Sequence, residues 1–327
     1  MNLLLITLCL ISVLLACAKV VDEFEPDCAE YFYNGKEPDL LDPNKPNPER
    51  FRKICQQYQN RFHFATLYDT VRRTPVYSAY RWRPKSQRLT TGEPHQCRSD
   101  VWMYEPKLAY PKGNADEMQE DRELFDTQAM DDDYKDSGYT RGHLNPNSHQ
   151  WDGFSQCSTF TMTNIVPQHK NSNSPPWSDH ENKILKRLEQ YCKSDAYIVT
   201  GVMPYINDKW IQKGNLRRVA IPEYLWSAYC CREFTNGHGQ EHLFPTFAVI
   251  GRNDKESDRR IVKNEDFNVQ EMSLSKLELF LKKRLGLRYI NVFYNKCNEF
   301  FFFLKKPKPK NPKSNKPKYN NLKSKNG

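Results

Sequence analysis

The cysteines constrain this chain more than any other feature. Ten are present in 327 residues, and two of them, Cys9 and Cys17, fall in an apolar run at the N-terminus. An even number then remains, which in a secreted chain indicates disulfides. Eight cysteines allow about 105 pairings, so the sequence assigns none of them. The remaining cysteines are Cys28, Cys55, Cys97, Cys157, Cys192, Cys230, Cys231 and Cys297.

Two details of the cysteine pattern narrow its interpretation. Cys230 and Cys231 are adjacent, and we expect them to take different partners because neighbouring residues rarely meet the geometry of a bridge. A structural zinc site is the alternative to disulfides. It has little support, because no two cysteines have the C-x2-C spacing that zinc sites favour.

The N-terminal run is typical of a secretory signal peptide. Residues 2–18 carry no charge and end in the small-x-small sequence Ala16-Cys17-Ala18. Cleavage after Ala18 would release a secreted, extracellular chain, and a retained N-terminal membrane anchor is the alternative. No other apolar run approaches the ~20 residues of a spanning helix, so we expect no integral membrane span after cleavage.

The C-terminal end is strongly basic. Residues 305–327 hold nine Lys and no acid, and the whole chain has a net charge of +9, so the rest of the chain sums to zero. Alternating Lys and Pro favour a disordered, solvated tail. Such a tail could bind polyanions, including nucleic acid, or could serve only to keep the protein in solution. The apolar residues 300–304 before it are expected to pack as a last strand.

Short β-prone runs dominate the region between the ends. Residues 65–70 and 75–82 predict a hairpin. Further strand-like runs lie at 196–202, 224–231 and 243–251. Many strands with few helices predict an α+β fold with a central antiparallel sheet and flanking helices.

The chain divides into four segments on these patterns. Residues 1–18 are the signal peptide, 19–60 form an N-terminal segment tied by Cys28 and Cys55, 61–304 form the main domain and 305–327 are the tail. Within the main domain the acids at 131–133 are expected to lie in a solvated loop, with little weight as metal ligands.

Two helices are predicted from apolar periodicity. The first covers residues 174–193, with Ser174 as the N-cap and Pro175 at the first helical position. The second starts at Ser275, where Glu278 three residues later indicates a capping box, and it ends at Gly286.

The segment at 139–150 is the densest in functional-looking side chains. Arg141 and His143 are two residues apart, so on an extended strand both project to one side. Gly142 between them would let a ligand approach the backbone closely. Taken alone, this pattern also fits a surface loop with one Arg and one His.

A second segment, at 163–184, adds an amide and a carboxylate. Asn173, Trp177 and Glu181 are spaced four apart and would share one helix face. Eight helical residues rise roughly 12 Å, too far for both polar side chains to bind one ion directly. An Asn oxygen with a carboxylate acting through water suits a hard ion such as Mg2+, which keeps most of its waters. The alternatives are a turn role for Asn173 and a capping box for Glu181.

Together the two segments resemble the DNA/RNA non-specific endonucleases, which have the ββα-metal (His-Me finger) fold. The matching residues are Arg141-Gly142-His143, then residues 164–168 (NIVPQ), Asn173, and Trp177 to Glu181. The likeness extends over roughly residues 60–290. The paired cysteines and the sequences CAEYFYNG and ICQQYQNRFHFATLYDT resemble a secreted branch of the family, the endonuclease domain-containing 1 proteins.

The resemblance implies a reaction and a role for each matched residue. His143 is the general base that activates water, and Asn173 holds one hydrated Mg2+, or another divalent cation such as Mn2+, against the scissile phosphate. Glu181 orients a water of that ion, Arg141 stabilises charge on the phosphoryl oxygens, and Arg98 is the candidate for a second arginine. The implied substrates are DNA and RNA with little sequence specificity, because none of these contacts reads a base edge.

One position departs from the family pattern. The family has Asp before the Arg of its hallmark, and this chain has Thr140. A Thr hydroxyl both donates and accepts hydrogen bonds but carries no charge. We therefore predict an active endonuclease, with a catalytically weakened protein that binds nucleic acid or other polyanions as the alternative.

Overall fold

The computed structural model describes residues 19–87, 97, 101–110, 118, 127–235, 241–253, 255, 267 and 269–297. All of these belong to one compact unit, Met1–Cys297. The predicted signal peptide, the last strand at 300–304, the basic tail and Arg98 lie outside the described residues.

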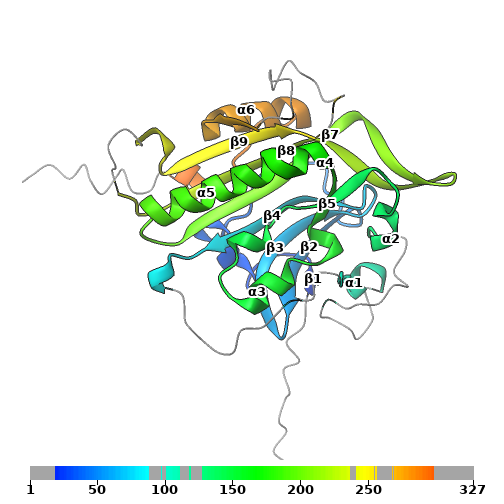
Figure 1. Ribbon diagram of the computed structural model, residues 1–327, viewed down its shortest axis with the longest axis horizontal. Helices are drawn as coiled ribbons and strands as arrows, with labels where there is room; N and C mark the ends of the chain where they lie inside the picture. Colours follow the sequence, from blue (N-terminus) through cyan, green and yellow to red (C-terminus); the bar gives the residue numbers. More distant parts are fainter. Residues whose placement is uncertain are drawn as a thin grey trace, which may run out of the picture. The chain divides into compact units, whose positions relative to one another are not determined.

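An eight-stranded sheet, antiparallel throughout, is the centre of this unit (Figure 1). The strand order is β1-β2-β3-β4-β7-β8-β9-β10. Among the described strands, β5 and β6 lie outside this sheet and form a separate two-stranded hairpin. The α+β class with an antiparallel sheet is confirmed. The strands are β1 (Lys19–Val21), β2 (Phe51–Tyr58), β3 (Arg61–Asp69), β4 (Thr74–Trp82), β5 (Tyr139–His143), β6 (Ile165–His169), β7 (Ala196–Lys213), β8 (Leu216–Cys231), β9 (Thr246–Arg252) and β10 (Val269–Met272).

The described strand-like runs correspond to strands, with two differences in their bounds: β3 ends one residue before the predicted run, and residues 243–245 precede β9, with Leu243 in a short helical turn. The hairpin at 65–82 is β3–β4, and the three later runs belong to β7, β8 and β9. Strand β8 is buried along almost its whole length, because both faces of the sheet are covered. Alternate residues enter different cores: Trp226 lies in one and Leu225 in the other.

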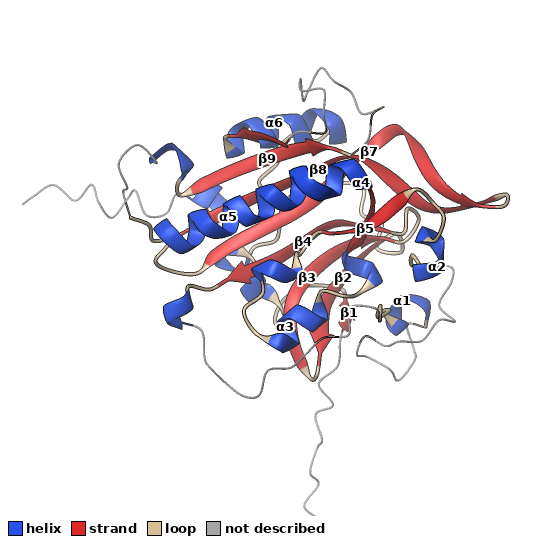
Figure 2. Cartoon of the chain, in the orientation of Figure 1, coloured by secondary structure: helices blue, strands red, loops and turns tan. Residues whose placement is uncertain are grey.

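The two long helices cover opposite faces of the sheet. Helix α5 (Ser178–Tyr191) packs Ile184 and Leu188 into the core that holds Leu225, and it lies across the front of the sheet in Figure 2. Helix α6 (Leu274–Leu285) packs Leu277 into the core that holds Trp226. No helix in the described part of the chain combines the length and apolar character needed to cross a membrane.

The predicted start of the first helix is wrong by four residues. Ser174 has extended backbone angles (φ −139°, ψ 122°), and the Ser174–Pro175 peptide bond is cis. Ser174 does not cap α5, because it lies four residues before the helix begins. The segment Asn173–Trp177 is irregular, and α5 begins at Ser178.

The second helix is displaced by a smaller amount. It begins at Leu274 after Ser273 rather than at Ser275. Glu278 forms no capping box, because its carboxylate accepts a hydrogen bond from the backbone N–H of Val292 at 3.1 Å. The predicted end is confirmed, since Gly286 takes the left-handed conformation with φ 67°.

Short helical turns complete the described elements. The α-helical ones are α1 (Pro106–Ala109), α2 (Asp131–Tyr134), α3 (Gly153–Ser158) and α4 (Lys170–Ser172). The others are η1 (Ala29–Tyr31), η2 (Tyr33–Gly35), η3 (Lys85–Gln87), η4 (Asn147–His149), η5 (Met162–Asn164), η6 (Asn173–Trp177), η7 (Glu241–Leu243) and η8 (Tyr294–Cys297).

Helix α2 corrects the interpretation of the acidic run at 131–133. Only Asp132 is exposed. Asp133 is buried and accepts two hydrogen bonds from Arg218, at 2.7 and 3.1 Å. Asp131 forms an ion pair with Arg141. The run is thus a paired, partly buried turn and not a solvated loop.

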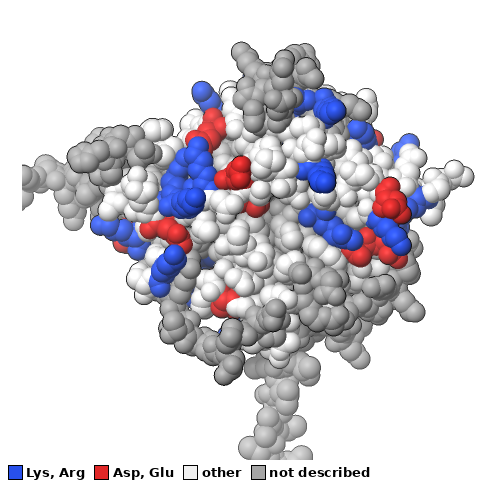
Figure 3. All heavy atoms as spheres, viewed as in Figure 1, with Lys and Arg blue, Asp and Glu red and all other residues white. Residues whose placement is uncertain are grey.

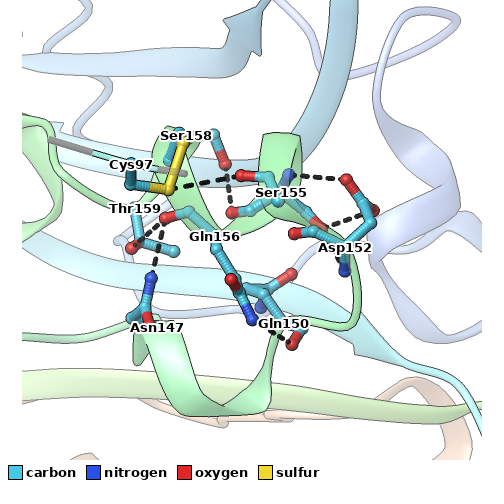
Figure 4. Close-up of a disulfide and its surroundings, with 10 residues drawn as sticks. Cys97, Asn147, Gln150, Asp152, Ser155, Gln156, Ser158 and Thr159 are labelled. Atoms are coloured by element: carbon cyan, nitrogen blue, oxygen red, sulfur yellow. Dashed lines mark hydrogen bonds between the residues drawn. A yellow bond between two sulfur atoms is a disulfide. The ribbon is translucent and has the colours of Figure 1, made fainter. Parts of the chain in front are cut away.

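Four disulfides pair the eight cysteines that follow the predicted signal peptide. Cys230 and Cys231 take different partners, as expected. The pairs are Cys28–Cys55, Cys97–Cys157, Cys192–Cys231 and Cys230–Cys297. Figure 4 shows the bridge from Cys97 to α3 among the polar side chains of that helix.

The β5–β6 hairpin places Gly142 against the side chain of Gln168. A Cβ added at Gly142 would lie 2.2 Å from Gln168 Oε1 and 2.7 Å from Gln168 Cβ. The space that the sequence suggested for a ligand is therefore filled by the protein's own glutamine. This contact explains why residue 142 is a Gly. It also shows how β6, the strand that carries Gln168, packs on β5.

Replacing Gly142 by Ala should destabilise the protein. The Gln168 side-chain end could move aside, but its Cβ cannot without shifting β6, so we expect a loss of about 1–3 kcal/mol, as for overpacked cores. Thermal unfolding measures it. Gly251→Ala is the graded control, because its Cβ would lie 3.2 Å from Trp177 and should cost less. Equal midpoints for Gly142→Ala and wild type would contradict the packing described here.

Candidate active site

A buried asparagine fixes the β5–β6 hairpin to the large sheet. The Asn253 amide group donates to the carbonyl oxygens of Pro167 in β6 and Pro222 in β8, both at 2.8 Å. Its oxygen accepts from the backbone N–H of His169 at 3.1 Å. Each polar atom of this side chain is used, so the hairpin is held at a fixed distance from β8.

A second asparagine orders the chain that follows His143. Asn164 Oδ1 accepts from the backbone N–H of Asn145 and from the Ser78 hydroxyl, each at 2.9 Å. Its amide group donates to the carbonyl oxygens of Asn145 and Thr159. In the sequence, Asn164 is the first residue of the NIVPQ motif, and no structural role could be assigned to it. Its partners are 5 to 86 residues away along the chain, so no local pattern revealed this role.

The same loop is braced from the side of α3 (Figure 4). Asn147 donates to the carbonyl oxygen of Gln156 at 3.1 Å, and the Thr159 hydroxyl donates to the same oxygen at 2.7 Å. Asp152 caps α3 by accepting from the backbone N–H of Ser155. The Cys97–Cys157 bridge ties the residue before Arg98 to this helix.

His143 ends β5 in an aromatic surround. Its ring centroid lies 5.6 Å from that of Trp102 and 5.4 Å from that of Phe160. Burial lowers the pKa of His143 to about 4. Its Nε2 is buried and has no hydrogen-bond partner among the described residues. At neutral pH the ring is therefore uncharged, with one nitrogen free to accept a proton.

Arg141 lies on the same face of β5 as His143, as the spacing predicted. Its guanidinium is 5.4 Å from the centroid of Trp102, the ring that also contacts His143. The Asp131 carboxylate pairs with one end of the guanidinium. Arg141 Nε has no hydrogen-bond partner within the described part of the chain. The sequence did not reveal Trp102 and Asp131 as the two side chains that position this arginine.

Asn173 is joined to β5 through Thr140. Its Nδ2 donates to the Thr140 hydroxyl at 3.0 Å, and that hydroxyl donates to the carbonyl oxygen of Gln168 at 2.8 Å. No donor among the described residues bonds to Asn173 Oδ1. The side chain is half-buried, so this oxygen is available to act as a ligand atom beside the hairpin.

Glu181 stands in the first turn of α5. Because Asn173 precedes the helix in an irregular segment, the predicted common helix face holds only for Trp177 and Glu181. Burial raises the pKa of the Glu181 carboxyl to about 8. Its backbone carbonyl accepts from His149 Nε2 at 2.9 Å, and His149 Nδ1 bonds to the Tyr80 hydroxyl. Over the residues described, no hydrogen bond or ion pair joins its carboxyl to Asn173 or His143.

The donor set fits a hydrated hard cation better than an enclosed one. Within the described ranges, no three His, Cys, Asp or Glu side chains are grouped so that they could hold a metal. The eight described cysteines are all in disulfides and are not ligands. One amide oxygen, Asn173 Oδ1, can still serve an ion that keeps most of its waters, which is how Mg2+ is commonly bound.

The described surface has no continuous basic field on the face shown in Figure 3. Lys and Arg side chains lie next to Asp and Glu, with broad uncharged areas between them. This agrees with the net charge of zero for the chain before residue 305. Attraction of a polyanion by this face would thus depend on a few local cations.

Comparison with known proteins agrees with this geometry. A profile of the DNA/RNA non-specific endonuclease family matches residues 48–278. The human Endonuclease domain-containing 1 protein is 35% identical over 215 residues, which are 63% of this chain and 39% of that protein. The mouse protein of the same name is 32% identical over 216 residues, 63% of this chain and 38% of its own. A Nuclease of Nostoc sp. is 24% identical over 282 residues, 82% of this chain and 87% of its own.

The match fixes the family and its branch. The chain spans about two fifths of the length of the human and mouse relatives, while the family profile covers most of the chain. The two antiparallel strands β5 and β6 followed by α5 form the ββα unit that the resemblance implied. The chain belongs to the DNA/RNA non-specific endonuclease family, and its similarity to the Endonuclease domain-containing 1 proteins supports the predicted branch.

Proposed function

We propose that this protein is a secreted, divalent-cation-dependent endonuclease that hydrolyses phosphodiester bonds in DNA and RNA. The observation that carries the proposal is the partnerless, buried Nε2 of His143 on the hairpin that also holds Asn173 with a free carbonyl oxygen. Four disulfides support an oxidising, extracellular compartment.

The residues divide the reaction between them. His143 Nε2 accepts a proton from the water that attacks phosphorus, because its ring is uncharged at neutral pH. The cation, Mg2+ or Mn2+, held by Asn173 Oδ1, would supply charge stabilisation for the phosphate and the leaving oxygen. Arg141 turns its guanidinium from Asp131 toward the phosphoryl oxygens as negative charge develops there. Arg98, beside the disulfide at Cys97, is proposed as a second phosphate contact.

Substrate choice follows from what these groups recognise. His143, Arg141 and Asn173 address water, phosphate and metal, and none of them is suited to reading the edge of a base. We therefore propose both DNA and RNA as substrates, with little sequence preference.

Replacing His143 by Ala should reduce cleavage by about 10²- to 10⁴-fold, the contribution of a positioned general base. Plasmid and single-stranded RNA cleavage by the purified chain in Mg2+ measures it, with EDTA removing activity in wild type. His242→Ala is the matched control, because His242 is exposed and lies outside the hairpin. Full metal-dependent activity in His143→Ala would contradict the assignment. Salt-sensitive binding of nucleic acid without cleavage by the wild type would favour the polyanion-binding alternative.

Cleavage activity should be lost in acid only at an unusually low pH. Burial holds the pKa of His143 at about 4 in the free protein, below the ordinary value of ~6.5, so the base stays unprotonated well below neutral pH. We expect kcat/KM, measured at saturating cation, to change little from about pH 8 to pH 6 and to fall only toward the His143 pKa. An acid limb with its midpoint near the ordinary histidine value would show that His143 is hydrated and not buried as described.

Glu181→Gln should change the pH dependence of stability and the binding of the cation, which can be measured separately. The folded protein holds a proton on Glu181 that the unfolded chain releases near pH 4.5, because burial raises the folded pKa to about 8. Stability in EDTA is therefore fully present at low pH and falls as pH rises through that window. A neutral Gln should remove this fall of stability with pH. It should also weaken cation binding by about 10- to 100-fold. Thermal midpoints against pH test the first effect, and identical slopes in both proteins would contradict it.

A further inference from the structure

Thr140 occupies the position at which the chain departs from its family pattern. It lies on β5 directly opposite Gln168 of β6. Its hydroxyl is the middle of a chain of two hydrogen bonds, from Asn173 Nδ2 to Thr140 Oγ1 (3.0 Å) and from Thr140 Oγ1 to the carbonyl oxygen of Gln168 (2.8 Å). The side chain thus connects the strand of the hairpin to the proposed metal ligand.

The direction of these bonds follows from proton counting. A hydroxyl has one proton to donate, and a backbone carbonyl can only accept. The Thr140 proton is therefore committed to the Gln168 carbonyl, and Thr140 can offer Asn173 only a lone pair. The atom of Asn173 that faces Thr140 must then be the NH2 group. The opposite assignment would place two acceptors in contact.

We propose that Thr140 is a positioning residue that fixes the Asn173 amide, so that its carbonyl oxygen, and not its NH2, faces the cation. This inference rests on the proposed function, because it assigns the ligand role to Asn173. It also gives a reason for Thr at this position. A carboxylate could accept from Asn173 Nδ2, but it could not donate to the Gln168 carbonyl. Thr140 accepts from Asn173 in the same way and also satisfies that backbone carbonyl.

Thr140→Val tests the proposal, because Val keeps the shape and removes the hydroxyl. Binding of Mn2+ to the metal-free protein, followed by electron paramagnetic resonance without nucleic acid, should weaken by about 10- to 100-fold, as for other outer-shell partners of metal ligands. The Mg2+ concentration for half-maximal cleavage should rise by the same factor, while the rate at saturating Mg2+ changes little.

Two controls distinguish positioning from a general loss of packing. Thr140→Ser keeps the hydroxyl and should bind Mn2+ as wild type does. Thr235→Val removes a hydroxyl that donates to the Tyr191 carbonyl at the opposite end of α5, and it should leave Mn2+ binding unchanged. If Thr140→Val does not fold by circular dichroism, Thr140→Ala replaces it and the same outcomes decide.

A second background sharpens the test. In Asn173→Asp the ligand has two equivalent oxygens and cannot be turned the wrong way. Adding Thr140→Val to Asn173→Asp should therefore weaken Mn2+ binding much less than adding it to wild type, which a double-mutant cycle measures directly.

The outcomes separate this proposal from the proposed function. Wild-type Mn2+ affinity in a folded Thr140→Val, with Mg2+-dependent cleavage intact, would overturn the role of Thr140 and leave the endonuclease assignment standing. An equal loss of affinity in both backgrounds would also overturn it. Absence of both Mn2+ binding and cleavage in wild type would overturn the proposed function and this inference together.

Discussion

The fixed position of the β5–β6 hairpin depends on two buried asparagine side chains. Asn253 joins the hairpin to β8, and Asn164 joins the loop after His143 to β4 through Ser78. A buried amide that loses its partners costs about 1–3 kcal/mol for each unsatisfied group, so these networks allow few alternative positions. The strand that the two asparagines hold carries His143, Arg141 and Thr140, so it sets the positions of these side chains. A catalytic constellation needs such rigid support, because small displacements of its groups are costly.

Burial tunes the titratable groups of the site in complementary directions. It keeps His143 uncharged and therefore able to accept a proton, and it keeps the carboxyl of Glu181 protonated in the absence of a cation. A divalent ion near Glu181 would favour the carboxylate, so cation binding and proton release should be coupled. Arg141 adds a positive charge that is paired with Asp131. In the proposed reaction, the same desolvation leaves His143 able to act as the base and lets the Glu181 carboxyl respond to the metal.

Local signals in the sequence gave correct predictions where the structure is local. Short β-prone runs predicted β3, β4, β7, β8 and β9, and the spacing of Arg141 and His143 predicted their common face. Two of the failures share a cause, which is a partner far away along the chain. Asp133 is neutralised by Arg218, 85 residues later, and Gly142 is packed by Gln168 from the other strand. The predicted start of α5 is wrong because the irregular segment Asn173–Trp177, in which Ser174 is non-helical, precedes the helix. The link from Asn173 to Thr140 spans 33 residues and required the folded hairpin.

In the proposed site, the amide oxygen of Asn173 holds the cation, and the uncharged ring of His143 on β5 accepts the proton. Anomalous diffraction from Mn2+-soaked crystals of His143→Ala with a short DNA duplex tests it most directly. We expect a single Mn2+ peak about 2.1 Å from Asn173 Oδ1, with Asn173 Nδ2 still bonded to Thr140 and a phosphate oxygen beside the ion. A peak held by other side chains, with Asn173 turned away from it, would show that Asn173 is not the metal ligand.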